Sequence, residues 1–121
     1  MTALLVPRAA VYVAALGLTI AIESPVYGLL LHAIEHTPIR RGILAGVFVN
    51  LVSHPVAFLA LFPVLFPVVG GLWALVVVEI LAVSMEASLL WLRGRRDPIA
   101  LVGISYLANA ASLSLGLLLL R

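Results

Sequence analysis

Three glutamates interrupt long apolar stretches of this chain: Glu23, Glu79 and Glu86 lie among Leu, Val, Ala and Ile residues. A charged side chain is costly at the centre of a bilayer, so carboxyl groups persist there mainly where they face a bundle interior, a partner or water. The functional residues are therefore expected around these three glutamates.

The spacing of the polar residues indicates which of them share a helix face. Residues three, four or seven positions apart lie on one side of a helix. Each apolar stretch carries one such pair: Glu23 and Tyr27, Asn50 and His54, Glu79 and Glu86, and Asn109 and Ser112. The sequence therefore predicts one polar stripe per helix.

The same residues fall at similar depths when positions are counted from the predicted cytoplasmic helix ends. At about 1.5 Å per residue, Glu23 and Asn50 both lie about 12 Å in, and Glu86 is somewhat shallower. His54 and Glu79 fall together about one turn further out. The predicted binding site is Glu23, Asn50, His54, Glu79, Glu86 and Asn109, supported by Tyr27, Ser105, Tyr106 and Ser112.

Carboxylate, amide and imidazole groups inside a membrane suit the binding of a cation. A divalent metal would take oxygen ligands with one or a few nitrogens, and the predicted metal ligands are Glu23, His54, Glu79 and Glu86. A cationic small molecule is the other ligand class. Carboxyl groups in a medium of low dielectric constant hold protons more tightly, so they can exchange a proton for a cation. The first hypothesis is therefore a small membrane carrier for a cation, with proton-coupled transport as one form of it.

Three other interpretations stay open. An intramembrane enzyme would use a glutamate as general base on a lipid or hydrophobic substrate, with His54 as ligand or acid. The sequence carries no H-E-x-x-H, G-x-S-x-G or P-loop signature for such an enzyme. An accessory subunit of a larger complex would turn some carboxylates outward. A purely structural role would have the polar groups hydrogen-bond between helices.

A second cluster, His32-Ala-Ile-Glu35-His36, formally matches the inverzincin pattern H-x-x-E-H. The match covers five residues, and the helix is expected to end there. We interpret the cluster as residues at the membrane interface, with Glu35 near Arg40 and Arg41. The minor alternative is a low-affinity site where metal ions enter or leave.

The composition identifies lipid as the solvent of this chain. Its 121 residues are 64% hydrophobic and only 10% charged, which does not suit the surface of a soluble domain. The seven basic residues are arginines at the ends of apolar runs, an arrangement that suits headgroups and offers no basic patch for nucleic acid. The absence of cysteine excludes disulfides and thiolate metal sites.

Length and end signals predict an all-α fold: an integral membrane four-helix bundle in one transmembrane domain, residues 1–121. The helices are expected at about 9–31, 38–62, 71–92 and 98–120, because a crossing needs roughly 20 apolar residues. Short connections predict an up-down-up-down course. Pro25 and Pro55 are expected to kink helices one and two beside the polar groups.

The arginines also predict orientation. Arg40, Arg41, Arg93, Arg95 and Arg96 lie in two loops on one side, and only Arg8 and Arg121 lie on the other. The positive-inside rule then places both termini outside the cytoplasm. The pair Gly42-x-x-x-Gly46 predicts close helix packing, within the chain or between two copies, and we expect a homodimer.

Overall fold

The computed structural model describes residues 2–94 and 97–119, without the side chains of residues 2–9 and 11, and the described chain is all-helical. Its elements are α1 (Thr2–Glu35), α2 (Ile39–Pro55), the π-helix η1 (Val56–Leu61), α3 (Phe62–Val69), α4 (Gly71–Gly94) and α5 (Pro98–Leu119). Because α2, η1 and α3 follow one another without a break, they form one long rod.

Four helical stretches are long and apolar enough to cross a membrane, as predicted. They are Tyr12–Glu35, Ile39–Val69, Gly71–Gly94 and Pro98–Leu119. The chain therefore fits a multi-pass membrane protein in a lipid bilayer. The up-down-up-down course through that bilayer and the proline kinks stay predictions, as does the single domain.

The connection predicted between helices two and three is wrong in length. Residues 63–69 are helical, and the turn is reduced to Gly70, whose φ of 85° places it in the left-handed region. Pro63 is the second residue of α3 and follows directly on the wider turns of η1, so the rod continues through it. Prolines mark turns poorly in a membrane segment, since neighbouring helices can compensate for the lost hydrogen bond.

The first helix also extends beyond its predicted bounds and ends at the histidine cluster. Glu35 is its last residue, and His36 has a φ of 58°, which breaks the helix before Pro38. The Thr37 N–H donates to the carbonyl of Leu31 at 3.1 Å. Of the H-x-x-E-H pattern, His32 and Glu35 thus lie on α1, and His36 lies beyond its end.

The glycine pair of α2 packs within the chain, against α1. A Cβ atom added to Gly42 would lie 2.8 Å from Cα of Gly28, and one added to Gly46 would lie 2.9 Å from Cα of Ser24. Backbone atoms block both positions, so only glycine permits this approach. The predicted close packing is confirmed, and its partner is α1.

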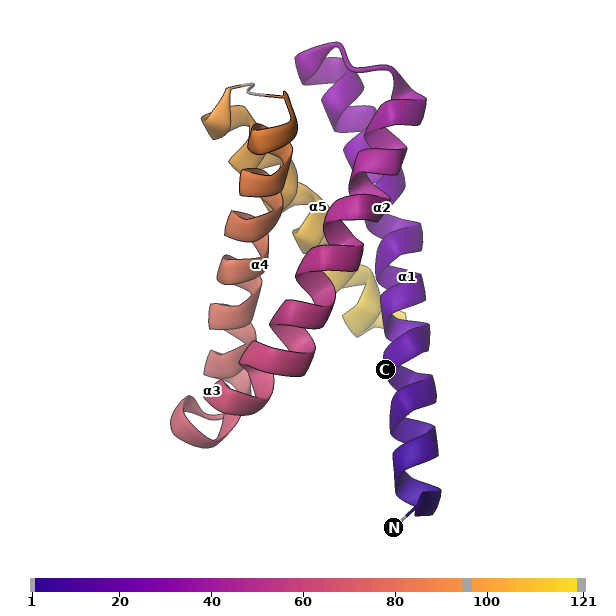
Figure 1. Cartoon of the computed structure of the whole chain (residues 1–121), viewed down its shortest axis with the longest axis vertical. Coiled ribbons are helices and arrows are strands. Elements are labelled where there is room, and N and C mark those ends of the chain that lie inside the picture. Colours follow the sequence, from indigo (N-terminus) through magenta and orange to yellow (C-terminus); the bar gives the residue numbers. More distant parts are fainter. Residues whose placement is uncertain (1, 95–96, 120–121) are drawn as a thin grey trace.

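Figure 1 shows how the long second rod crosses between two neighbours. Near the α1–α2 connection, α2 lies beside α1, and further along, η1 and α3 pack against α4. Helix α5 starts beside α4 and crosses behind the rod to α1. The largest apolar core, which includes Tyr27, Val49 and Ile104, closes the half of the bundle near the interhelical connections α1–α2 and α4–α5. A smaller core of Ala57, Val78 and Ala82 joins the rod to α4.

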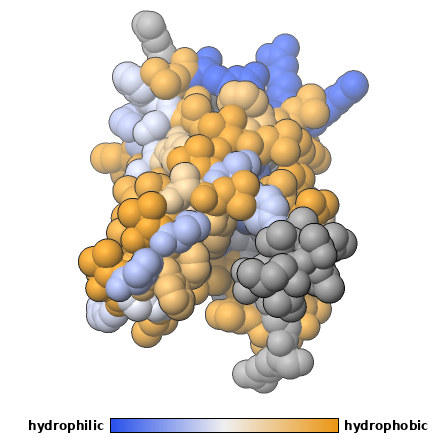
Figure 2. All heavy atoms as spheres, turned by 60° about the horizontal axis from the view of Figure 1, so that its bottom comes forward, coloured by the Kyte–Doolittle hydropathy of each residue, from blue (hydrophilic) through white to orange (hydrophobic). Residues whose placement is uncertain are grey.

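The surface matches a lipid environment. In Figure 2 apolar residues cover most of the visible face, and strongly hydrophilic residues gather along the upper edge. The arginines Arg40, Arg41 and Arg93 are exposed at the helix ends near the connections. Arg95, Arg96 and Arg121 lie outside the described residues, as does the side chain of Arg8.

Candidate functional site

A cavity of about 620 Å³ lies between the four membrane helices, and every one of them contributes to its lining. On α1 and α4 the lining residues follow helical spacing: Tyr12, Ala15, Thr19 and Glu23, and Leu75, Glu79, Ala82 and Glu86. The rod contributes Asn50, Ser53, His54 and Phe58, and α5 contributes Asn109, Ser112, Leu113, Gly116 and Leu117. The polar stripes predicted from spacing therefore face one another.

All six predicted binding residues line this cavity, but their side chains are held differently. Glu86 is 1% exposed, and both of its oxygens accept hydrogen bonds. The Tyr27 hydroxyl donates to Oε1 at 2.7 Å, and Nδ2 of Asn109 donates to Oε2 at 3.1 Å. Glu86 is thus tied to α1 and α5 at once.

Glu23 is equally buried but only half satisfied. Its Oε2 accepts a hydrogen bond from the hydroxyl of Ser112 on α5. Its Oε1 has no partner among the described residues, although the side chain is only 1% exposed. Since a buried oxygen without a donor is costly, this atom offers a place for a ligand or a proton.

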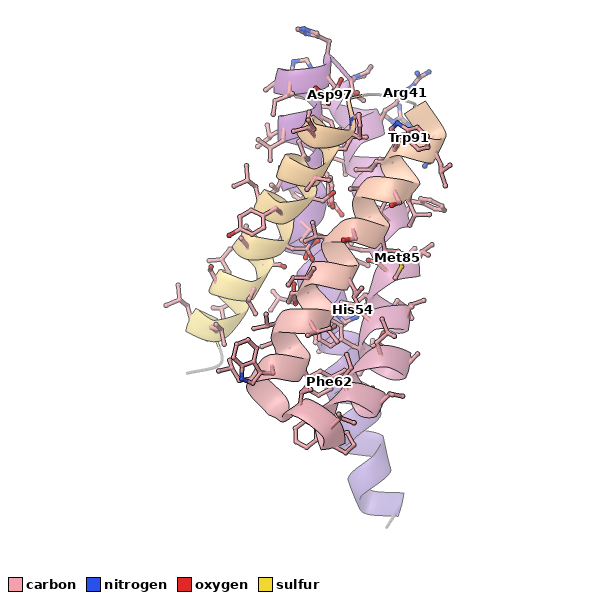
Figure 3. The ribbon with its side chains drawn as sticks, turned by 90° about the vertical axis from the view of Figure 1, so that its left-hand side faces the viewer. Arg41, His54, Phe62, Met85, Trp91 and Asp97 are labelled. Carbon is pink, nitrogen blue, oxygen red and sulfur yellow. The ribbon has the colours of Figure 1, made fainter. Side chains whose placement is uncertain are left out.

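Beyond the carboxyl groups, a row of aromatic rings lies along the side of the rod that faces the cavity. The ring of His54 lies 5.5 Å from that of Tyr12 and 4.6 Å from that of Phe58. Phe62 and Phe66 follow at four-residue spacing. The ring centroids of Phe58 and Phe62 are 6.2 Å apart, and those of Phe62 and Phe66 are 5.8 Å apart. Figure 3 shows His54 and Phe62 one above the other beside α4.

The charges of the cavity are one-sided. Glu23, Glu79 and Glu86 line it, and no arginine is among its described lining residues. His54 is its nearest basic group, and its Nδ1 lies 3.3 Å from the Tyr12 hydroxyl. Three carboxyl groups in a medium of low dielectric constant cannot all stay ionised without counter-charges, so the cavity requires protons or a cation.

The four predicted supporting residues separate into three places. Ser112 lines the cavity, whereas Tyr27 and Ser105 are fully buried in its wall. Tyr106 is 63% exposed and lies outside the central cavity, in a groove between α4 and α5. Its position one residue beyond Ser105 turns it to the outer face of α5.

The predicted metal ligands share the cavity without surrounding one point. Within residues 2–94 and 97–119, no three His, Asp or Glu side chains come close enough together to hold a metal ion. The four predicted ligands Glu23, His54, Glu79 and Glu86 therefore do not form such a group. The cluster at the end of α1 does not form one either, and Nδ1 of His32 lies 3.0 Å from the carbonyl oxygen of Thr37.

Several lining residues were missed by the sequence analysis. Tyr12 and Thr19 continue the stripe of Glu23 at intervals of seven and four, and Ser53 lies three residues from Asn50. Extending the stripe by one turn finds Thr19 and Ser53, and extending it by three turns finds Tyr12. Phe58 lies four residues beyond His54 on the same stripe, but an aromatic side chain in an apolar helix is equally suited to face lipid.

No protein-family description, no curated protein and no solved structure matches this chain.

Proposed function

We propose that this protein is a small membrane carrier that binds a cationic organic molecule in the central cavity. The observation that carries the proposal is the half-satisfied carboxyl group of Glu23 beside two further carboxyl groups, with no arginine among the described lining residues. An ammonium group of a ligand would supply both the missing donor and the missing charge.

The walls favour an organic cation over a bare metal ion. The rings of Tyr12 and Phe58 line the cavity together with Leu75, Leu113 and Leu117. Aromatic faces attract ammonium groups and apolar walls take up a hydrocarbon body. A divalent metal would want several ligands around one point, an arrangement that the described side chains do not form.

Proton exchange follows from the same charges. When the cation leaves, a proton would neutralise the carboxyl group that held it, Glu23 or Glu79, and when the cation binds, that proton would be released. Glu79 suits this exchange because it lines the cavity and is only partly buried.

The proposed path opens away from the interhelical connections. The core around Tyr27 and Ile104 closes the half near the connections, and the cavity extends toward Tyr12 of α1 and toward Leu117 near the end of α5. With the arginine-bearing connections in the cytoplasm, both termini would be non-cytoplasmic, the course would be up-down-up-down, and the cavity would face the non-cytoplasmic side. Proline kinks beside the site and a homodimer stay predictions of this proposal.

Two alternatives have less support. An accessory subunit predicts that some carboxylates turn outward, whereas Glu23 and Glu86 are each 1% exposed and Glu79 is partly exposed. An intramembrane enzyme predicts a metal with an open coordination position and a lateral opening; the groove beside Tyr106 supports only the second of these.

The proposal is tested with ethidium, a fluorescent aromatic monocation, in protein-containing liposomes and in nanodiscs. Glu79→Gln should weaken ethidium binding about tenfold or more, since a charge-assisted contact is worth about 1.5–3 kcal/mol. It should reduce pH-dependent uptake in parallel. Glu35→Gln is the matched control, because Glu35 does not line the cavity. Equal binding and uptake by the wild type and Glu79→Gln would remove the reason for this site.

A further inference from the structure

A second hollow of about 580 Å³ lies between α4 and α5, on the outside of the bundle. Its lining includes Ile80, Val102 and Tyr106, which are 60%, 48% and 63% exposed. In Figure 3, α4 and α5 face the viewer, and Figure 1 shows α5 turning away from α4 with increasing distance from the α4–α5 connection. The hollow is therefore a groove in the face that these two helices turn to the surroundings.

The groove is at the depth of the hydrocarbon core. It runs from Val102 to Leu113 along α5, which is about 17 Å of helix. Both of its helices continue beyond it, α4 to Gly94 and α5 to Leu119. At this depth the groove meets acyl chains and no bulk water.

Three residues line both the groove and the central cavity: Glu79, Asn109 and Leu113. They form a thin partition with a carboxyl group in it. Glu79 is partly buried, in contrast to the fully buried Glu23 and Glu86. A group in the groove is thus one side chain away from the acidic cavity.

Two further polar side chains of the groove, Ser84 and Tyr106, indicate which kind of molecule it suits. Ser84 donates to the carbonyl of Ile80 on its own helix at 2.9 Å, so its hydroxyl is already satisfied. Tyr106 carries its hydroxyl halfway along α5, away from the headgroup region where exposed tyrosines usually lie. A groove with apolar walls, one phenol and one carboxyl group suits an amphiphilic cation better than an acyl chain.

We propose that the groove between α4 and α5 is a lateral access route through which amphiphilic monocations dissolved in the bilayer reach the central cavity past Glu79. This inference rests on the proposed function and deepens it, because it names the substrate class and its path. Glu79 attracts the charged end, while Val83 and the exposed face of Gly103 leave room for the apolar body.

Gly103 gives a direct way to block the route. A Cβ atom at this position would meet nothing within 4 Å, so the side chain of Gly103→Trp starts into open space, and its ring is placed to fill the groove. Gly17→Trp is the matched control: Gly17 is equally free of neighbours and lines neither hollow. Val83→Trp blocks the groove from the side of α4 and provides a second variant if the first fails to fold.

The experiment measures ethidium binding to the protein in nanodiscs, at equilibrium and by stopped flow. Gly103→Trp and Val83→Trp should slow association and dissociation about tenfold each and leave the Kd within about twofold, because a blocked route changes rates and not the site. Gly17→Trp should match the wild type. Unchanged rates in folded Gly103→Trp or Val83→Trp would overturn the lateral route while wild-type binding still supported the carrier. A weaker Kd through faster dissociation would also overturn it, since the groove would then be part of the site. Absence of wild-type binding would overturn both proposals.

Discussion

Glu23 and Glu86 line the same cavity with the same burial, yet their hydrogen bonds give them different tasks. Glu86 accepts from Tyr27 and from Asn109, whereas Glu23 accepts from Ser112 and keeps Oε1 without a donor at hydrogen-bond distance. The first is held by its surroundings, and the second is left with capacity for a ligand. Residue type and depth do not separate them; their partners do.

Replacing Glu23 should therefore affect ligand binding first. Glu23→Gln retains the shape of the side chain and an oxygen for Ser112 but loses the charge that a cation needs. We expect ethidium affinity to fall about tenfold or more, as for other charge-assisted contacts. Isothermal titration in nanodiscs measures it. Affinity equal to that of the wild type would show that Glu23 does not contact the cation.

Removing the hydroxyl that supports Glu86 should instead lower stability. Tyr27→Phe leaves Oε1 of a buried carboxyl group without its donor at 2.7 Å, which costs about 1–3 kcal/mol. Tyr106→Phe is the control, because that side chain is 63% exposed. Thermal unfolding in detergent should separate the two variants, and equal melting temperatures would contradict the proposed support of Glu86.

At the scale of elements, the contact between α1 and α2 fixes the two polar stripes against each other. Gly28, Gly42 and Gly46 bring the two backbones together, so Glu23 and Asn50 reach the same cavity. The rod then leaves α1 and packs on α4 through η1, and this divergence makes room for the cavity between them.

An added methyl group at this contact should force the helices apart. Gly42→Ala would place a Cβ atom 2.8 Å from Cα of Gly28, with only backbone atoms nearby. We expect a loss of about 1–3 kcal/mol, as in other overpacked sites. Gly17→Ala meets nothing within 4 Å and should be neutral or slightly stabilising. Unfolding in a denaturing detergent compares them, and similar stability of the two would argue against the close packing.

At the scale of the whole molecule, cation binding and proton release should be linked. A cation needs ionised carboxyl groups and acidification protonates them, so affinity should fall as the pH is lowered. Ethidium added to weakly buffered protein should release protons, and a pH indicator measures them. Glu79→Gln should release fewer protons. Binding that is independent of pH would contradict an exchange of proton for cation.

The orientation of the molecule is tested separately. With Arg40, Arg41 and Arg93 at the cytoplasmic surface, a tag at either terminus should be labelled in intact cells without permeabilisation. A tag in the connection that contains Thr37 is the internal control and should need permeabilisation. The opposite pattern would invert the bundle and the side to which the cavity opens.

The sequence alone determined that four apolar helices are present and that each carries one polar stripe, because length and helical spacing are local properties. Tertiary structure decided the rest. Only packing shows that Glu86 is satisfied while Glu23 is not, since their partners come from other helices. Tyr106 is predicted to support the binding site but faces outward, because lipid-facing and buried positions are equally apolar in this chain and the pattern does not distinguish the two faces.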